Sequence, residues 1–523
     1  MAIGRMRGET RGERARALGA LILVALSGFA PAVAAAEKVF TYALAAAPES
    51  LDSAKTTSER AWYVTWLLCD ALVNVSADGR RLEPSLAESW TLAADGLSAT
   101  IRLRAGALFH DGSPIDAAAV KTSFERQFRP ESRLYTSDPP NGRESMLRDL
   151  IQDIEVQGPR VLVFKLKYAG LHYLSQVDII SPAALEKRGR DFGRKPACSG
   201  PFKVESWTGD QLLLTAHAQY WAGRPLIDRV VFRFISDPKA SVEALLKGEV
   251  DFTPLIRDPA LLERAREGPR VKLLKVPALN TVYLGFYTER PPFDNALVRT
   301  AVVRGIDVGR AALFLMRGTA VPAKGPLPPL VRGYDPEVGQ PPFDPQAARA
   351  LLARAGHAAG LTVRLVYNDA LSWQSEYAAA IQGDLRRIGV RVELSGKPSY
   401  QAQVSAIVAR EGDMFIDVWG LRAPHPERLL VPLFHSGAGD ATNWTRYRNR
   451  DLDRLLDEAR RLPEGPAQVT AYSKAQRVIV DDAPMVFLYH GLRMAAHADR
   501  VKGLSLNPLS LPVDKLVTVD LGP

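Results

Sequence analysis

Short β-type runs alternate with amphipathic helical segments along most of this chain, and this alternation limits the possible fold more than any other feature. Val39–Leu44 has the pattern of a strand, and Glu59–Leu72 then has that of a helix with an aromatic face. Strands that alternate with helices predict an α/β protein. Further strands are expected at Thr100–Arg104, Val161–Leu166, Leu212–Ala216, Val230–Ile235, Leu361–Tyr367, Arg391–Leu394 and Met414–Trp419. Further helices are expected at Ala240–Leu246, Pro345–Ala355, Glu376–Ile388, Asp451–Arg461 and Thr470–Asp482.

The first residues have the composition of a secretory signal peptide. A basic start is followed by an apolar run over Ala17–Phe29 and then by mostly small residues over Ala32–Ala36. This order predicts export, with cleavage near Ala36. The alternative is a membrane anchor, but the run is short and Gly28 and Pro31 interrupt it. No cysteine directly follows the run to carry a lipoprotein anchor, so we expect a periplasmic protein.

The charge distribution argues against a nucleic-acid partner. The net charge is +9, and the signal segment with its five arginines and two glutamates supplies +3 of this, which leaves +6. Basic and acidic residues are mixed along the rest of the chain, whereas a nucleic-acid binder concentrates its positive charge in a patch or stripe. An apolar content of 46% is ordinary for a globular protein.

Cys69 and Cys198 are the two cysteines of the chain. Export permits a disulfide bond, but the sequence does not give the distance between their Cα atoms. We expect two free, buried cysteines.

Five blocks of sequence occur in the order known from one protein family. They include LEPSLAESW…FHDGSPID…SFER at Leu82–Arg126, SGPFKVESW…AQYWAGRP…SDP at Ser199–Pro238, and ALLKGEVDF at Ala244–Phe252. NTVYLGFYTERPPFDNALVRTAVVRGID at Asn280–Asp307 and FDPQAARALLARAG at Phe343–Gly356 follow. Together these blocks resemble family 5 of the bacterial extracytoplasmic solute-binding proteins, the dipeptide, oligopeptide and nickel-binding group. The chain departs from the family in one motif, where Cys-Ser replaces Gly-Thr before Gly-Pro.

This resemblance implies a two-lobed α/β fold with an extra small domain on lobe one. The ligand would be enclosed between the lobes as they close by hinge bending. Hinge strands are expected near Pro277–Asn280 and Tyr489–Gly491. The implied division is a signal peptide at 1–36, lobe I at 37–80, 198–278 and 491–523, the extra domain at 81–197, and lobe II at 279–490.

The resemblance also implies the function and the partners. We expect a non-enzymatic binding component of an ABC importer that captures a peptide or peptide-like solute and delivers it to a membrane permease. No cofactor is expected, and a monomer is the expected state. An exported hydrolase is the competing class, but the sequence carries no G-x-S-x-G, S-x-x-K or zinc motif in a plausible context.

The loop after Met414–Trp419 is the best candidate for ligand contact. In peptide-binding members, an Asp three residues after the matching tryptophan pairs with the peptide ammonium, whereas here Trp419 is followed by Arg422. Arginine suits a carboxylate or phosphate, so the ligand is expected to present an anion there unless the loop is shifted and Arg422 faces solvent. Further candidate contacts are His425, Trp373, Glu49 and Trp444.

A nickel chelate is the alternative ligand. The residues Trp419-Gly420 and Ala423-Pro424 match the nickel-binding members once a gap of two residues is allowed. The metal-site histidine of those members could then correspond to His435. No helical or Cys-based metal-ligand motif accompanies it.

Overall fold

The computed structural model describes residues 36–56, 58–76, 78, 81–136, 143–255, 258–421, 423–509, 511–512 and 514–522. The chain divides into residues 1–37 and a compact unit of residues 38–523, and the fold below is that of the second unit. The predicted signal peptide lies outside the described residues except for Ala36. No helix in these described ranges has the length and apolar character needed to cross a membrane.

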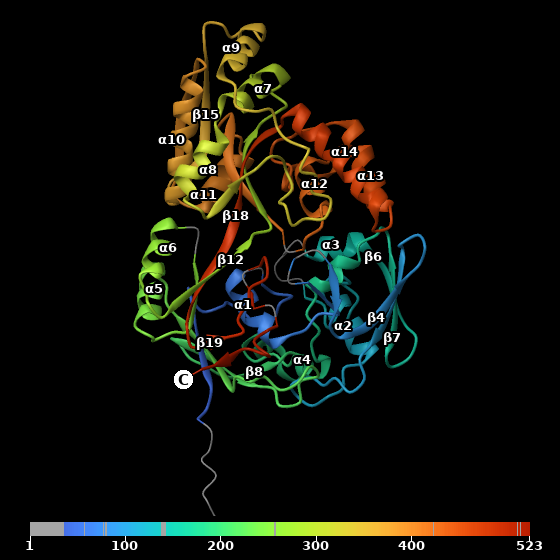
Figure 1. Cartoon of the computed structure of the whole chain (residues 1–523). Coiled ribbons are helices and arrows are strands. Elements are labelled where there is room, and N and C mark those ends of the chain that lie inside the picture. The colour runs from blue at the N-terminus through green and yellow to red at the C-terminus, as the bar shows by residue number, and fades with distance from the viewer. Residues whose placement is uncertain are drawn as a thin grey trace, which may run out of the picture. The chain divides into compact units, whose positions relative to one another are not determined.

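One large mixed sheet, with twelve strands in the described ranges, runs through residues 38–523 (Figure 1). Its strands are β1 (Val39–Leu44), β8 (Phe202–Trp207), β9 (Gln211–Ala216), β10 (Arg229–Phe234), β11 (Phe252–Leu255), β12 (Val271–Pro277), β13 (Asn280–Phe286), β14 (Ala320–Pro322), β15 (Leu361–Asn368), β16 (Val390–Lys397), β17 (Met414–Gly420) and β18 (Met485–Ala498). Their spatial order is β16-β15-β17-β13-β18-β11-β1-β10-β9-β8, and β12 and β14 also pair with β18. The predicted α/β class is confirmed.

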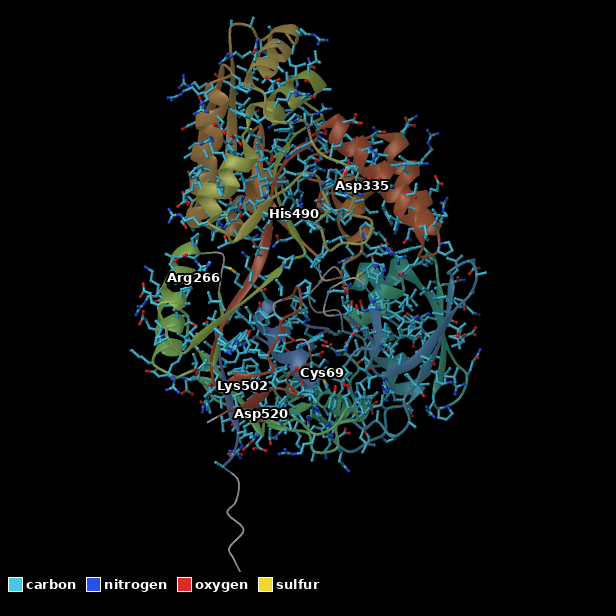
Figure 2. All side chains as sticks on the ribbon, viewed as in Figure 1. Cys69, Arg266, Asp335, His490, Lys502 and Asp520 are labelled. Carbon is cyan, nitrogen blue, oxygen red and sulfur yellow. A yellow bond between two sulfur atoms is a disulfide. The ribbon has the colours of Figure 1, made fainter. Side chains whose placement is uncertain are left out.

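The 14-residue strand β18 pairs with both halves of this sheet. It pairs first with β13, then with β14, and finally with β12 and β11. The second connection between the two halves of the sheet is not one continuous strand, because β12 ends at Pro277 and β13 begins at Asn280. The side-chain oxygen of Asn280 accepts a hydrogen bond from the N–H of Gly491 at 2.9 Å. Figure 2 labels His490, the residue before Gly491 on β18. A Cβ atom at position 491 would lie 2.9 Å from that oxygen, so glycine permits this close approach.

A second sheet, antiparallel and four-stranded, has a core of its own. It consists of β4 (Ala87–Leu92), β5 (Ser98–Leu103), β7 (Val161–Leu166) and β6 (Ile151–Val156), in that order. Helices α2 (Ala117–Glu125) and α3 (Arg143–Leu150) contact β6. Phe124 and Phe164 meet edge to face inside this core, with ring centroids 5.0 Å apart. Two short pairs also occur, β2 (Val73–Val75) with β3 (Leu82–Pro84) and β19 (Val501–Lys502) with β20 (Asp520–Leu521).

Side-chain caps begin many of the helices. Asp344, the predicted N-cap of Pro345–Ala355, accepts hydrogen bonds from the N–H groups of Gln346 and Ala347. Gly356 follows this helix with a φ of +88°, which confirms it as the predicted stop. The remaining helices are α1 (Glu59–Leu68), α4 (Pro182–Arg188), α5 (Pro238–Leu246), α6 (Pro259–Arg266), α7 (Ala296–Gly305), α8 (Val308–Met316), α9 (Pro345–Arg354), α10 (Ser372–Arg386), α11 (Tyr400–Val408), α12 (Glu427–Phe434), α13 (Arg450–Arg461) and α14 (Pro466–Asp482). The 3-10 helices are η1 (Leu171–Gln176), η2 (Gly189–Arg194) and η3 (Ser436–Ala441).

The predicted starts of two helices are wrong, and the helix expected from Thr470 begins at Pro466. The helix expected from Glu376 begins at Ser372, so Trp373 lies in its first turn rather than in a loop. Its N-cap residue is Leu371, which has no side-chain oxygen to accept a backbone hydrogen bond. The sequence therefore carries no cap signal at this boundary.

Cys69 and Cys198 form a disulfide bond, which corrects the expectation of two free cysteines. Their Cα atoms lie 4.8 Å apart, although 129 positions separate them in the sequence. Both side chains are buried, as expected. The helix expected over Glu59–Leu72 ends at Leu68, because Cys69 is already extended. The bond thus joins the end of α1 to the segment before β8, and it closes the stretch of chain that forms the four-stranded sheet.

Candidate ligand-binding site

Two of the predicted ligand contacts, Trp419 and Trp444, lie beside the same face of β17. Trp419 and Phe415 are four residues apart on the strand and point to one side of the sheet. The Trp444 ring meets Phe415 edge-on, with centroids 6.3 Å apart. The indole N–H of Trp419 donates to the carbonyl oxygen of Arg428 at 2.7 Å, which fixes the orientation of the ring. Arg422 lies outside the described residues, and its contact with an anion stays a prediction.

Trp373 and Glu49 are placed differently. Trp373 packs in the core cluster on the opposite face of the sheet, where its ring meets Tyr489 edge-on at 6.0 Å. It therefore does not gather with the other two tryptophans. Glu49 is exposed, and its carboxylate accepts a hydrogen bond from Ser58 Oγ at 2.6 Å and pairs with Arg60. These local partners hold Glu49 against the start of α1.

His425 is buried in a contact between two distant segments of the chain. Its imidazole stacks on that of His172 in η1, with centroids 3.9 Å apart and 9° between the ring planes. Burial, followed by Arg332 and Arg428, lowers the pKa of His425 to about 3. Burial, followed by His425 and these arginines, also holds the pKa of His172 well below its ordinary value. Both rings are therefore neutral at pH 7. His172 was not predicted, because a lone histidine outside any motif is not distinctive in a sequence.

Glu427 completes a group with these two histidines. The three side chains present nitrogen and oxygen atoms that all lie within 4.8 Å of one another, a spacing compatible with a metal ion. However, stacked rings direct their in-plane lone pairs parallel to each other rather than toward one point. Arg460 Nε also donates to Glu427 at 3.0 Å, and the neighbouring arginines would repel a cation. The group suits two neutral imidazoles better than a metal centre.

His435, the predicted metal ligand of the nickel alternative, lies at the end of α12. Its Nδ1 accepts a hydrogen bond from the N–H of Gly437 at 2.9 Å, and its Nε2 lies 3.5 Å from Asp457. Within the described ranges it is not part of any group of three side chains spaced to hold a metal. The structure therefore adds no support to the nickel alternative.

A hollow with an aromatic wall lies beside α1 and η1. It has about 780 Å³ of empty space and is partly open to solvent. Trp62 and Trp66 are one helical turn apart on α1 and form the aromatic wall. Its other lining residues are Ser53, Thr56, Ser58, Thr65, Cys69, Ala71, Asn74, Val75, Ser175, Gln176, Asp178, Asn507, Leu509 and Lys515.

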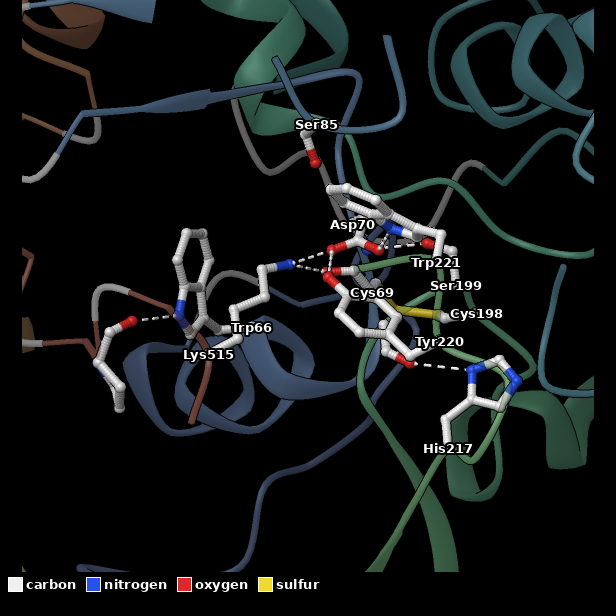
Figure 3. Close-up of polar contacts among 12 residues, drawn as sticks. Trp66, Cys69, Asp70, Ser85, Cys198, Ser199, His217, Tyr220, Trp221 and Lys515 are labelled. Carbon is white, nitrogen blue, oxygen red and sulfur yellow. Dashed lines mark hydrogen bonds and ion pairs between the residues drawn. A yellow bond between two sulfur atoms is a disulfide. The ribbon is translucent and has the colours of Figure 1, made fainter. Parts of the chain in front are cut away.

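A buried carboxylate, Asp70, fixes the wall of this hollow (Figure 3). Lys515 Nζ lies 2.7 Å from one Asp70 oxygen and 2.6 Å from the carbonyl oxygen of Cys69. Tyr220 and Trp221 donate to the same carboxylate at 3.2 and 2.9 Å. The Lys515 ammonium also lies 4.6 Å from the centroid of the Trp66 ring. One acid therefore ties α1, the segment after β9 and the C-terminal segment together.

The chemistry of the hollow is that of a binding pocket. Its aromatic faces can stack on planar or apolar groups, and its hydroxyl and amide groups can exchange hydrogen bonds with a polar ligand. Lys515 lines the hollow, but Asp70 already neutralises its charge. The sequence predicted the aromatic face of α1 but not its role as the wall of a hollow, because the other walls come from η1 and the C-terminal segment.

Comparison with known proteins decides the family. The family model described as bacterial extracellular solute-binding proteins, family 5 Middle, matches residues 81–441, which is more than half of the chain. The chain belongs to this family. The membership confirms the resemblance found in the five sequence blocks, and family 5 consists of binding proteins.

Relatives of this solute-binding protein match along most of its length. Di/tripeptide-binding protein 2 of Pseudomonas aeruginosa is 29% identical over 517 residues, which cover 94% of this chain and 96% of the relative. Heme-binding protein A of Haemophilus influenzae is 29% identical over 475 residues, or 86% of each chain. The periplasmic binding protein DppA of Helicobacter pylori, an ABC transporter-associated protein solved with the peptide STSA, superposes with a TM-score of 0.78 at 26% identity. That superposition covers 93% of this chain and 98% of DppA, and it confirms the periplasmic-binding-protein fold.

Proposed function

We propose that this solute-binding protein captures a peptide or peptide-like solute, anionic ones included, between two closing lobes and delivers it to the permease of an ABC importer. The observation that carries the choice of a peptide is the hollow walled by Trp62 and Trp66 and lined by hydroxyl and amide groups, which lies on the side of lobe I and the extra domain. Peptide side chains vary, so a peptide binder needs adaptable polar contacts and flat apolar surfaces. The names of the Pseudomonas and Helicobacter relatives agree with a peptide ligand.

The predicted lobes remain part of this proposal. Lobe I would comprise residues 37–80, 198–278 and 491–523, with the extra domain at 81–197 and lobe II at 279–490. The strand pairing supports this division, since β1 and β8–β12 fall in lobe I and β13–β17 in lobe II. Closure would bend the chain near Pro277–Asn280 and Tyr489–Gly491, where β18 crosses from one half of the sheet to the other.

The proposal extends to maturation and to the absence of catalysis. Cleavage near Ala36 would release a periplasmic monomer that binds its solute without converting it. The ligand contacts proposed here are Trp62 and Trp66, with Trp419, Trp444, His425 and Arg422 from lobe II. Glu49 and Trp373 have weaker support, because the first is engaged by Ser58 and Arg60 and the second packs in a core.

Calorimetry with a peptide panel tests the proposal. The mature protein is titrated with di-, tri- and tetrapeptides and, separately, with hemin, and each peptide is checked by mass spectrometry for cleavage after incubation. We expect saturable binding of intact peptides, with a raised midpoint of thermal unfolding. Tight binding of hemin without any peptide would contradict a peptide ligand, and peptide cleavage would contradict a non-enzymatic protein.

A tryptophan pair locates the site. Trp62→Ala removes one wall of the hollow, and we expect it to weaken peptide binding about tenfold, the effect of losing one aromatic stacking contact. Trp207→Ala is the matched control, because Trp207 stacks under Arg194 at 4.2 Å and does not line the hollow. Equal affinities for the two variants would show that the peptide binds elsewhere.

A further inference from the structure

Three arginines surround the stacked imidazoles of the buried histidine pair, and two of them have an acidic partner. Arg460 pairs with Glu427 at 3.0 Å, and Arg332 pairs with Glu464. Arg428 has no carboxylate within 4.0 Å in the part of the chain that the structure describes. The arrangement therefore leaves the Arg428 guanidinium without a direct ion pair, although the Glu427 carboxylate attracts it from a longer distance.

Arg428 is withdrawn from water by its surroundings. It is half-buried, its guanidinium carbon lies 5.2 Å from the centroid of the Tyr173 ring, and its Nε is shielded from solvent without a hydrogen-bond partner. A desolvated cation is costly unless an anion or a set of acceptors compensates it. The Tyr173 ring and its hydroxyl group compensate part of this cost, but a guanidinium fork is best satisfied by a carboxylate that accepts two hydrogen bonds.

The two histidines next to it also have unused hydrogen-bonding groups. All four ring nitrogens of His172 and His425 are buried and have no partner of good geometry within the described ranges, although the Gln468 side chain lies near the His425 ring. A neutral imidazole carries one N–H donor, so the pair offers two donors beside Arg428. Buried polar atoms without partners are rare in folded proteins and call for an occupant.

The position of this cluster connects it to the candidate site. The carbonyl oxygen of Arg428 accepts a hydrogen bond from the indole N–H of Trp419, which lies one residue before the end of β17. On the opposite side, η1 supplies His172 and Tyr173 to the cluster, and its last two residues, Ser175 and Gln176, line the hollow. The cluster thus adjoins the hollow through a single short helix.

We propose that Arg428, with the N–H groups of His172 and His425, forms a subsite for a carboxylate of the ligand. This subsite rests on the proposed function, and it specifies that one group of the ligand is an anion. It places the anion-binding arginine six residues after Arg422, on α12, where its backbone is tied to Trp419. Glu427 faces His425 at 3.9 Å and would repel a carboxylate, but Arg460 neutralises it.

A carboxylate can come from the C-terminus of a peptide or from an acidic side chain, and four probes separate these sources. The tripeptides Ala-Glu-Ala and Ala-Gln-Ala are each prepared as the free acid and as the C-terminal amide, and each is titrated by calorimetry. If the subsite takes the C-terminus, amidation should weaken binding at least tenfold, the scale of one charge-assisted contact. If it takes the side chain, the exchange of Glu for Gln should have that effect instead.

Substitution of Arg428 assigns the effect to the subsite. Arg428→Gln should bind the charged and neutral probes within about twofold of each other, and Arg428→Lys should retain part of the difference because it keeps the charge but not the fork. Arg454→Gln is the control, since Arg454 is an exposed arginine of α13 and its loss changes the net charge equally. The midpoint of thermal unfolding establishes that each variant is folded. If an Arg428 variant does not fold, Arg428→Met replaces it, because methionine keeps an apolar contact with Tyr173.

The outcomes separate the subsite from the proposed function. If wild-type protein binds peptides but does not discriminate charged from neutral forms, or if Arg428→Gln and Arg428→Met retain the discrimination, the subsite is refuted and peptide binding stands. If wild-type protein binds no peptide of the panel, the proposed function is refuted and the subsite falls with it.

Discussion

The Cys69–Cys198 bond cross-links positions 129 residues apart and encloses the chain that builds the four-stranded sheet. In the chain-entropy model, cross-linking a loop of this length lowers the entropy of the unfolded chain by about 17 cal/mol/K. At 25 °C this corresponds to about 5 kcal/mol of stability. Reduction should therefore remove a large part of a typical folding free energy of about 5–15 kcal/mol.

Urea unfolding of the oxidised and reduced forms measures this contribution. The same preparation is unfolded with and without a phosphine reductant, and tryptophan fluorescence and far-ultraviolet circular dichroism are followed together. A loss of about 5 kcal/mol should lower the midpoint by on the order of 1–2 M urea for a protein of this size. Peptide mapping by mass spectrometry establishes the redox state of each sample. Because the chain has several cores, the two probes need not report one transition.

If the oxidised and reduced samples, with their redox states established, unfold at the same urea concentration, this reasoning is refuted. The bond would then not restrict the unfolded chain. Cys69→Ala/Cys198→Ala serves as a second test without any reductant. Both sulfur atoms are buried, so alanine avoids placing two hydroxyl groups in the core. This variant should behave like the reduced protein, apart from a modest additional packing loss.

Two further predictions concern buried acids. Arg126→Met should lower the free energy of unfolding by about 3–5 kcal/mol, because it leaves the buried Asp52 carboxylate without the guanidinium that contacts its two oxygens at 2.8 and 2.9 Å. The double variant Arg126→Met/Asp52→Leu should restore part of this loss. Thermal unfolding of both variants measures the effect. Burial raises the pKa of the Asp417 carboxyl to about 7. The folded state therefore binds more protons than the unfolded state between about pH 4 and pH 7. As the pH rises through this window, Asp417 lowers the free energy of unfolding by about 1.4 kcal/mol per pH unit. Asp417→Asn should therefore stabilise the protein more at pH 8 than at pH 4, and an equal effect at both pH values would contradict the buried, titrating carboxyl.

Local sequence patterns predicted the regular elements well. Val39–Leu44 and Val161–Leu166 are strands with the predicted bounds, because alternation of side chains along a strand is a property of the strand itself. Asp344 is the N-cap of α9 for a similarly local reason, since its carboxylate reaches N–H groups two and three residues ahead. The start of α10 was missed because Leu371 offers no such hydrogen bond.

Contacts between distant segments could not be read from the sequence. The Cys69–Cys198 bond depends on a Cα separation that no local pattern encodes. The stacking of His425 on His172 likewise depends on how η1 meets the loop before α12. The family blocks supplied the two-lobed fold and directed attention to Trp419, whereas Arg428 emerged only once its neighbours were known, because surface and buried arginines have the same local sequence signature.

The pairing of β18 also has a consequence for export. Residues 485–498 are the shared partner of β11, β12, β13 and β14, and they come near the end of the chain. Until they arrive, each half of the large sheet has an unpaired edge and cannot be completed. A chain that crosses the membrane from its N-terminus would therefore finish this sheet only after almost all of it has been translocated. For an exported chain, we therefore expect the late position of β18 to delay completion of the large sheet before translocation.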